Sequence, residues 1–241
     1  MVLTEEEIEK ENKRIAKQYK ELLRISYRTL TDDDKTLIRQ AFETAVDAHK
    51  EQRRKSGEAY IFHPLAVARI VASEIGMDAT SIAAALLHDV VEDTIYTLED
   101  LEERFGPTVA RIVDGLTKIS NLKKHRDVSL QAENFRKMLL TINDDVRVII
   151  IKIADRLHNM QTMDSMRPDK QIKIASETLY IYAPLAHRIG LYNIKTELED
   201  LGLKYTEPEV FKDISRKMKE TKEQQDQYIE EFTQAVQKSL D

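Results

Sequence analysis

Cysteine and tryptophan are absent from this sequence of 241 residues, and glycine and proline are scarce. Without cysteine, disulfides, thiolate zinc sites and thiol nucleophiles are excluded. Glycine and proline number 6 and 5, far below their average combined share of about 12%. Because sandwiches and barrels need many tight turns, this shortage favours an all-α protein.

A surplus of positive charge and long apolar runs are also missing. Lys and Arg number 37 against 43 Asp and Glu, which gives a net charge of −6. A chain of this sign lacks the broad basic surface of a protein dedicated to duplex DNA. The N-terminus has no apolar signal region, and the longest apolar runs, at 82–87 and 148–151, are too short to cross a bilayer. We therefore expect a soluble, cytoplasmic protein with no DNA and no membrane partner.

Apolar spacing and the positions of the breaking residues predict a series of helices. They are expected at about 5–24, 31–50, 63–76, 79–93, 97–106, 108–120, 131–141, 144–164, 169–188 and from 208 onward. An exposed loop is expected at 121–129, and a bend at Pro184. The run 146–154 has the composition of a buried strand, but it continues through 163 without Gly or Pro, which favours one long helix.

The segment LLHDVVEDT, at 86–94, carries the first sign of chemistry. His88 and Glu92 are four residues apart, as are Asp89 and Asp93, so a helix would place each pair one turn apart on nearly one face. These ionisable groups follow an apolar run, and burying them without partners would be costly. A divalent cation would remove that cost, because imidazole and carboxylate are its usual ligands. The alternative is a solvated, acidic helix end.

Other ionisable residues strengthen the metal interpretation. His63 begins a helix just before a proline, and Asp155 lies within the apolar stretch IIIKIADRLHNM. Together with His88 and Asp89, they form a set of two imidazoles and two carboxylates from three expected helices. Such a set would leave positions for water and substrate, and it suits Mn, Fe, Co or Zn better than Ca.

Five segments together resemble one known family. They are RRKSGEAYIFHP (53–64), HDVVEDT (88–94), IVDGLTKIS (112–120), ADRLHNMQT (154–162) and IYAPLAHRIGLYNIKTELEDL (181–201). The family is the N-terminal hydrolase domain of the Rel/Spo group of bifunctional (p)ppGpp synthetase-hydrolases, within the HD phosphohydrolase superfamily. This resemblance implies an HD-domain bundle of roughly ten helices. It also implies bound Mn²⁺ and hydrolysis of the 3′-pyrophosphate of ppGpp or pppGpp to GDP or GTP plus pyrophosphate, as in alarmone turnover during the stringent response.

The resemblance also implies roles for individual residues. The metal ligands would be His63, His88, Asp89 and Asp155. The acidic pair acting on the nucleophilic water would be Glu92 and Asp93, with the choice of base left open. The loop holding the guanine and nearby phosphates would contain Arg54, Lys55 and Ser56, and the opposite wall Asn159 and Thr162. Two positions depart from the family pattern, Ala59 in place of a usual Pro and Gln161 in place of a common Arg.

The basic loop, residues 51–62, is expected to bind the nucleotide, and the metal set (His63, His88, Asp89 and Asp155) is expected to bind the metal independently of it. An Arg54 side chain can stack on a purine and pair with phosphate, so its replacement should weaken nucleotide binding and leave the metal content unchanged. Among the other histidines, His49 and His125 are expected at the surface and His187 in a structural role. His158, three residues after Asp155, is either a supporting group of the site or a satisfied core histidine.

The charged composition beyond residue 205 predicts a helix that leaves the core. We expect an N-terminal helical segment at 1–30, the hydrolase domain at 31–205 and a connector at 206–241 toward a synthetase domain. The resemblance implies synthetase and regulatory domains in a full-length protein, and the connector favours a truncated chain over a stand-alone hydrolase. Two alternatives remain open, an HD-superfamily nucleotidase or phosphodiesterase for another nucleotide and an inactive regulatory module.

Overall fold

The computed structural model describes residues 4–26, 30–122 and 145–240. These residues form helices joined by short turns, with one isolated bridge between Arg53 and Ala59 as their only β pairing. The expected all-α class is therefore confirmed. The helix expected at 131–141 and most of the loop expected at 121–129, with His125, lie outside the described residues.

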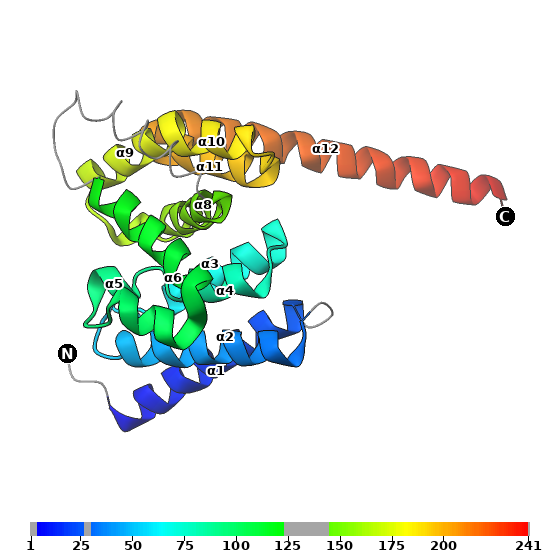
Figure 1. The fold of residues 1–241 in the computed structure, drawn as a ribbon. Coiled ribbons are helices and arrows are strands. Elements are labelled where there is room, and N and C mark those ends of the chain that lie inside the picture. Colours follow the sequence, from blue (N-terminus) through cyan, green and yellow to red (C-terminus); the bar gives the residue numbers. More distant parts are fainter. Residues whose placement is uncertain (1–3, 27–29, 123–144, 241) are drawn as a thin grey trace.

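Two N-terminal helices form one side of the molecule (Figure 1). Helix α1 runs over Glu5–Ser26, and α2 runs over Asp32–Ala48. Thr31 caps α2 through a reciprocal pair of hydrogen bonds with Asp34, as its position before three acidic residues predicts. Helix α2 packs against α4, and α1 packs against α3.

The central helices begin after the basic loop. Helix α3, Phe62–Ile70, continues into the π-helical turn η1, Val71–Ile75, which ends at Gly76 with a left-handed φ of 77°. Helix α4 covers Ala79–Leu86, and the short α5 covers Val90–Asp93.

The prediction of a single helix at 79–93 is wrong, because a turn at residues 87–89 separates α4 from α5. The Leu87 amide is shared between the carbonyls of Ala83 and Ala84, at 3.1 and 3.2 Å. The imidazole of His88 then bonds the Ala85 carbonyl at 2.8 Å, in the place of the next helical amide. A side-chain hydrogen bond therefore ends α4 where the apolar pattern continues.

Helix α6, Leu98–Leu122, and helix α8, Val146–Gln161, cross the centre. Helix α6 starts at the Thr97–Asp100 cap and kinks at Gly106, which has a φ of 81° just before Pro107, so the expected division there is confirmed. The 146–154 run is helical, as its uninterrupted continuation predicts.

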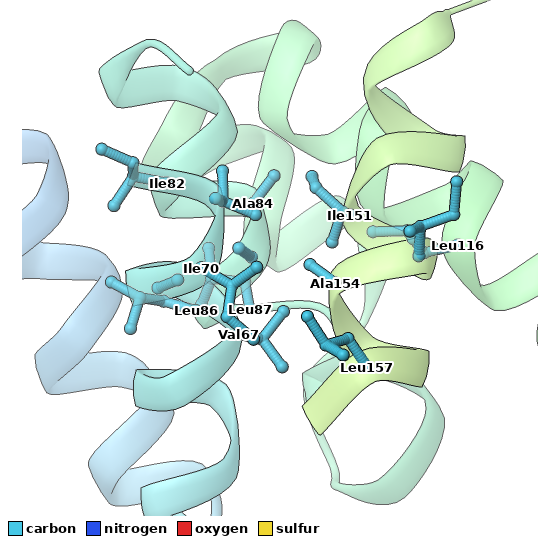
Figure 2. Close-up of a cluster of buried hydrophobic side chains, with 14 of the residues drawn as sticks. Val67, Ile70, Ile82, Ala84, Leu86, Leu87, Leu116, Ile151, Ala154 and Leu157 are labelled. Carbon is cyan, nitrogen blue, oxygen red and sulfur yellow. The ribbon is translucent and has the colours of Figure 1, made fainter. Parts of the chain in front are cut away.

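A common core joins α3, α4, α6 and α8 (Figure 2). Its buried side chains include Val67, Ile70, Leu86, Leu116 and Leu157. Asp155 is next to Ala154 of this core, so the helix that supplies much of the apolar packing also carries a buried carboxylate.

The C-terminal helices form the other side of the molecule. They are α9 (Pro168–Glu177), the π-helical η3 (Thr178–Tyr182), α10 (Ala183–Arg188), α11 (Tyr192–Thr206) and α12 (Pro208–Leu240). The short 3-10 turn η2, Met163–Ser165, precedes them. The irregular turn before Pro184 confirms the expected bend there.

Helix α12 extends away from the other helices (Figure 1), and its apolar side chains Ile214, Met218 and Phe232 are exposed. A helix that leaves the core after 207 is thus confirmed, whereas its role as a connector and the boundaries at 30 and 205 stay predictions. Within the described ranges, no helix combines the length and apolar character needed to cross a membrane.

Gly115 marks the close approach of α6 to α8. A Cβ atom at this position would lie 2.8 Å from Cγ2 of Val148, which is shorter than normal van der Waals contact. We expect Gly115→Ala to destabilise the fold, because an overpacking cost of about 1–3 kcal/mol exceeds the gain of roughly 0.5–1 kcal/mol from better helix propensity. Urea denaturation measures the change. Glu103→Ala, at an exposed position of the same helix, is the control and should change the free energy of unfolding little.

Candidate active site

Three segments distant in sequence bring two imidazoles and a carboxylate together in the core. His63 belongs to α3, His88 to the turn after α4, and Asp155 to α8. All three are buried, and each offers a ligand atom within 4.8 Å of the others. Nε2 of His63 is 3.3 Å from Oδ1 of Asp155, and Nε2 of His88 is 4.0 Å from the same oxygen. This group can hold a divalent metal ion.

Asp89 lies beside this group, on the side of the two imidazoles. Its Oδ2 atom is 3.0 Å from Nε2 of His88 and 3.7 Å from Nε2 of His63. The same oxygen accepts a hydrogen bond of 2.6 Å from the Tyr60 hydroxyl. The structure thus brings the four residues expected as ligands together, with His63, His88 and Asp155 forming the tighter subset.

The hydrogen bonds of His88 prepare one of its nitrogens for a metal. Nδ1 faces the Ala85 carbonyl at 2.8 Å and must therefore carry the proton, since a carbonyl only accepts. In the neutral imidazole Nε2 then has the lone pair, and this atom is buried 3.0 Å from Oδ2 of Asp89 with no hydrogen-bond partner among the described residues. A buried acceptor of this kind beside two carboxylates fits a divalent cation well.

Buried charges around Asp155 compensate one another. Nζ of Lys152 lies 2.9 Å from Oδ2 of Asp155 and donates to the Ser120 hydroxyl at 3.0 Å. Burial opposes the charged form of Asp155, but the nearby Lys152 ammonium outweighs it and holds the pKa of that carboxyl well below its usual value. The carboxylate therefore stays ionised and available as a ligand.

The acidic pair Glu92 and Asp93 lies on α5. The amide of Asp93 bonds the Asp89 carbonyl at 2.9 Å, so the expected one-turn relation between these two residues holds although the longer helix is broken. Glu92 is half-buried and Asp93 is exposed. The side-chain amide of Gln52 donates to the Asp93 carbonyl at 2.7 Å and ties α5 to the start of the basic loop.

The basic loop is held in shape at both ends by α1. Arg53 makes a two-pronged ion pair with Glu11, with both N–O distances at 2.8 Å. Arg14 pairs with Glu58 at 2.7 Å, and Gly57 takes the left-handed φ of 87° that closes the turn. Arg53 is therefore engaged with α1.

Of the three expected loop residues, Arg54 is hydrogen-bonded to the expected opposite wall. Its Nη2 donates to Oδ1 of Asn159 at 2.9 Å, and its Nη1 lies 3.2 Å from Nδ1 of His158. Lys55 and Ser56 are exposed. Arg54 thus bridges the basic loop and α8.

Of the two residues expected on the opposite wall, Asn159 contacts the metal-binding group and Thr162 is exposed. The Asn159 amide donates to Oδ1 of Asp155 at 2.6 Å, which joins it to the metal-binding group. Thr162 is exposed, and its hydroxyl bonds the His158 carbonyl at 2.7 Å. Gln161, where the family pattern has Arg, donates to Glu197 at 2.6 Å.

Three further histidines and a tyrosine can now be compared with their expected places. His49 was expected at the surface but is 2% exposed, because it ends α2 beneath the loop, where Nδ1 is 2.8 Å from Gln52 and the ring is 4.7 Å from that of Tyr60. His158 contacts His63, so it supports the site, and burial lowers its pKa to about 3. Tyr60 was missed, although it lies within the segment 53–64. His187, expected in a structural role, is exposed and packs edge-to-face against Tyr192, with the ring centroids 5.5 Å apart.

Comparison with known proteins assigns the family. A family model for the HD domain matches residues 41–192, a range that contains all four expected metal ligands. The chain belongs to the HD domain family. This HD domain is 47% identical over 211 residues to the bifunctional (p)ppGpp synthase/hydrolase SpoT of Escherichia coli, a match covering 88% of the chain. It is 46% identical over 212 residues to a protein of Myxococcus xanthus named GTP pyrophosphokinase, with 87% of the chain covered.

The HD domain spans only part of these relatives, 30% of the Escherichia coli protein and 28% of the Myxococcus xanthus protein. A solved structure, described as a metazoan ortholog of SpoT that hydrolyzes ppGpp, is similar with a TM-score of 0.54 and 27% identity. That match covers 72% of this chain and 96% of the metazoan chain.

The pair of Lys152 and Asp155 yields a stability prediction. We expect Lys152→Met to lower the free energy of unfolding of the chelated protein by about 3–5 kcal/mol, because it leaves a buried carboxylate without its cation. Urea denaturation in EDTA measures this loss. Lys118→Met is the control, since Lys118 pairs with Asp114 on the exposed side of α6 and such a pair contributes about 0–1 kcal/mol. Equal losses in both variants would contradict the compensating role of Lys152.

Proposed function

We propose that this domain hydrolyses the 3′-pyrophosphate of ppGpp or pppGpp and releases GDP or GTP and pyrophosphate. The observation that carries the proposal is the buried group of His63, His88 and Asp155, with Asp89 beside it and Nε2 of His88 buried without a hydrogen-bond partner among the described residues. A soluble enzyme with such a group is suited to metal-dependent attack on an anionic phosphate ester.

The relatives support the substrate class and the direction of the reaction. The Escherichia coli protein is named as both synthase and hydrolase of (p)ppGpp, and the Myxococcus xanthus protein is named for pyrophosphate transfer to GTP. The metazoan protein, which is described as hydrolysing ppGpp, is matched over 96% of its chain. A matched region that is nearly a whole hydrolase favours hydrolysis as the activity of this domain.

The proposed metal is Mn²⁺, with His63, His88, Asp89 and Asp155 as its protein ligands. Imidazole mixed with carboxylate suits Mn and its neighbours in the first transition row. When bound, such a cation lowers the pKa of a water molecule and neutralises charge on the phosphate that is attacked. Lys152 keeps Asp155 ionised, and Tyr60 orients Asp89 through its hydroxyl.

The remaining residues are proposed to act on the water and the nucleotide. Glu92 or Asp93 would take the proton of the attacking water, from α5 one turn beyond Asp89. Hydrogen bonds to α8 use the edge of the Arg54 guanidinium, so a purine can stack on its face without breaking them. The phosphates would meet Lys55 and Ser56 from the loop, and the nucleotide would meet Asn159 and Thr162 from α8 and its end.

The setting of the reaction is proposed from the same relatives. We expect a cytoplasmic protein in which α12 leads toward synthetase and regulatory domains, since the matched relatives are about three times longer than this match. A guanosine nucleotide is its expected partner.

Metal removal and ligand substitution test the reaction. We expect pyrophosphate release from ppGpp in Mn²⁺ and none in excess EDTA, with GTP, ATP and cyclic nucleotides as a comparison panel. His88→Ala and Asp89→Asn should lose turnover and bind Mn²⁺ more weakly, while circular dichroism still reports a helical fold. Affinity for the metal should also fall in acid, because protons compete for the imidazoles. An unchanged rate in EDTA would remove the metal from the reaction.

Substitutions of the acidic pair Glu92 and Asp93 should affect turnover but not binding. We expect Glu92→Gln and Asp93→Asn to keep metal and nucleotide binding but to lower kcat, by about 10²–10⁴-fold for the residue that acts as general base. Glu102→Gln, at an exposed position of α6, is the matched control and should keep the wild-type rate. If both site variants come out free of metal, these residues are ligands and the proposed division of roles is wrong.

A further inference from the structure

His158 lies between a proposed metal ligand and a proposed nucleotide contact. Its Nδ1 atom is 2.7 Å from Nδ1 of His63 and 3.2 Å from Nη1 of Arg54. These residues come from α8, α3 and the basic loop, and Arg54 is 104 positions from His158 in the sequence. One nitrogen of one half-buried ring therefore connects the two parts of the site.

The guanidinium decides which of these nitrogens carries a proton. Arginine has donors and no acceptor, so Nδ1 of His158 faces it as an acceptor and carries no hydrogen. Nδ1 of His63, which faces the same lone pair, must then be the donor. The free lone pair of His63 is thereby assigned to Nε2, which lies 3.3 Å from Asp155 and 3.7 Å from Asp89. This is the nitrogen that a metal in the group would need.

The other terminal nitrogen of the Arg54 guanidinium, Nη2, is connected to Asp155 through the Asn159 amide. Nη2 donates to Oδ1 of Asn159 at 2.9 Å, which fixes the orientation of that amide. Its nitrogen must then face Oδ1 of Asp155, and it does so at 2.6 Å. His88 differs, because its proton is placed by the Ala85 carbonyl within its own segment. Arg54 is thus connected to two proposed ligands through one intermediate residue each.

We propose that His158 is a positioning residue through which Arg54 couples nucleotide binding to metal affinity. The inference rests on the proposed metal and nucleotide site. A nucleotide that holds Arg54 against α8 favours the His63 tautomer and the Asp155 orientation that bind the metal. Because such coupling is reciprocal, the metal tightens nucleotide binding by the same factor. Arg54→Ala then keeps one metal per chain at saturation but binds it more weakly.

Titration of the metal-free protein with Mn²⁺, with and without GDP, tests the coupling without turnover. In the wild-type protein we expect GDP to lower the Kd for Mn²⁺. His158→Leu removes the acceptor, and we expect its Kd for Mn²⁺ to rise about 10–100-fold, the usual effect of removing a group behind a metal ligand. It should also lose most of the GDP effect. His158→Gln, which restores an acceptor oxygen, should recover part of both.

The controls separate coupling from general damage to the fold. His187→Leu replaces an exposed histidine of α10 and should keep the wild-type Kd and GDP effect. Arg54→Lys can reach only one of the two intermediates, so it should recover only part of what Arg54→Ala loses. A wild-type Kd and GDP effect in His158→Leu, beside weakened binding in His88→Ala, overturns the coupling and leaves the metal site standing. A wild-type Kd in His88→Ala overturns both.

Discussion

A single side-chain hydrogen bond organises the site. His88 gives the Ala85 carbonyl the proton that the next helical amide would otherwise give, and α4 ends there. The same bond fixes the His88 tautomer and leaves Nε2 directed toward the carboxylates. Helix α5 begins at Val90, directly after the turn at residues 87–89, so the acidic pair follows on a separate short helix. Helix termination, ligand preparation and the approach of the acidic pair thus have one cause.

The core can contain these polar groups because their charges and protons are matched. The two oxygens of Asp155 are divided between donors, with the Lys152 ammonium on Oδ2 and the Asn159 amide on Oδ1. An unpaired carboxylate at this depth would be strongly unfavourable. The apolar packing of α3, α4 and α8 (Figure 2) sets the spacing of the proposed ligands. The Lys152 ammonium balances the charge of Asp155, so this arrangement does not require a bound metal.

The sequence predicts most helices, because they depend on local signals, whereas the site residues were expected largely from the resemblance to a known family. Caps at Thr31 and Thr97 and the break at Gly106 act on their immediate neighbours, and each is confirmed. The break after Leu86 escaped prediction, because no Gly or Pro marks it and the His88 bond to the Ala85 carbonyl cannot be read from apolar spacing. Tyr60 and the burial of His49 depend on contacts across the fold, which spacing does not reveal. Arg54 and His158 are 104 positions apart, so the sequence did not reveal their contact. For this reason the basic loop and the metal set were expected to be independent.

The ion pairs from α1 to the two ends of the basic loop bear on the entropy of ligand binding. Glu11 holds Arg53 and Arg14 holds Glu58, so the residues between them have less conformational freedom before any ligand arrives. Each exposed pair stabilises the fold by only about 0–1 kcal/mol. Their larger effect is on recognition, since ordering a flexible side chain at an interface costs roughly 0.5–1.5 kcal/mol and a loop already fixed avoids part of that loss. Helix α1, which the expected boundary at residue 30 sets apart from the hydrolase domain, would in this sense belong to the proposed binding site.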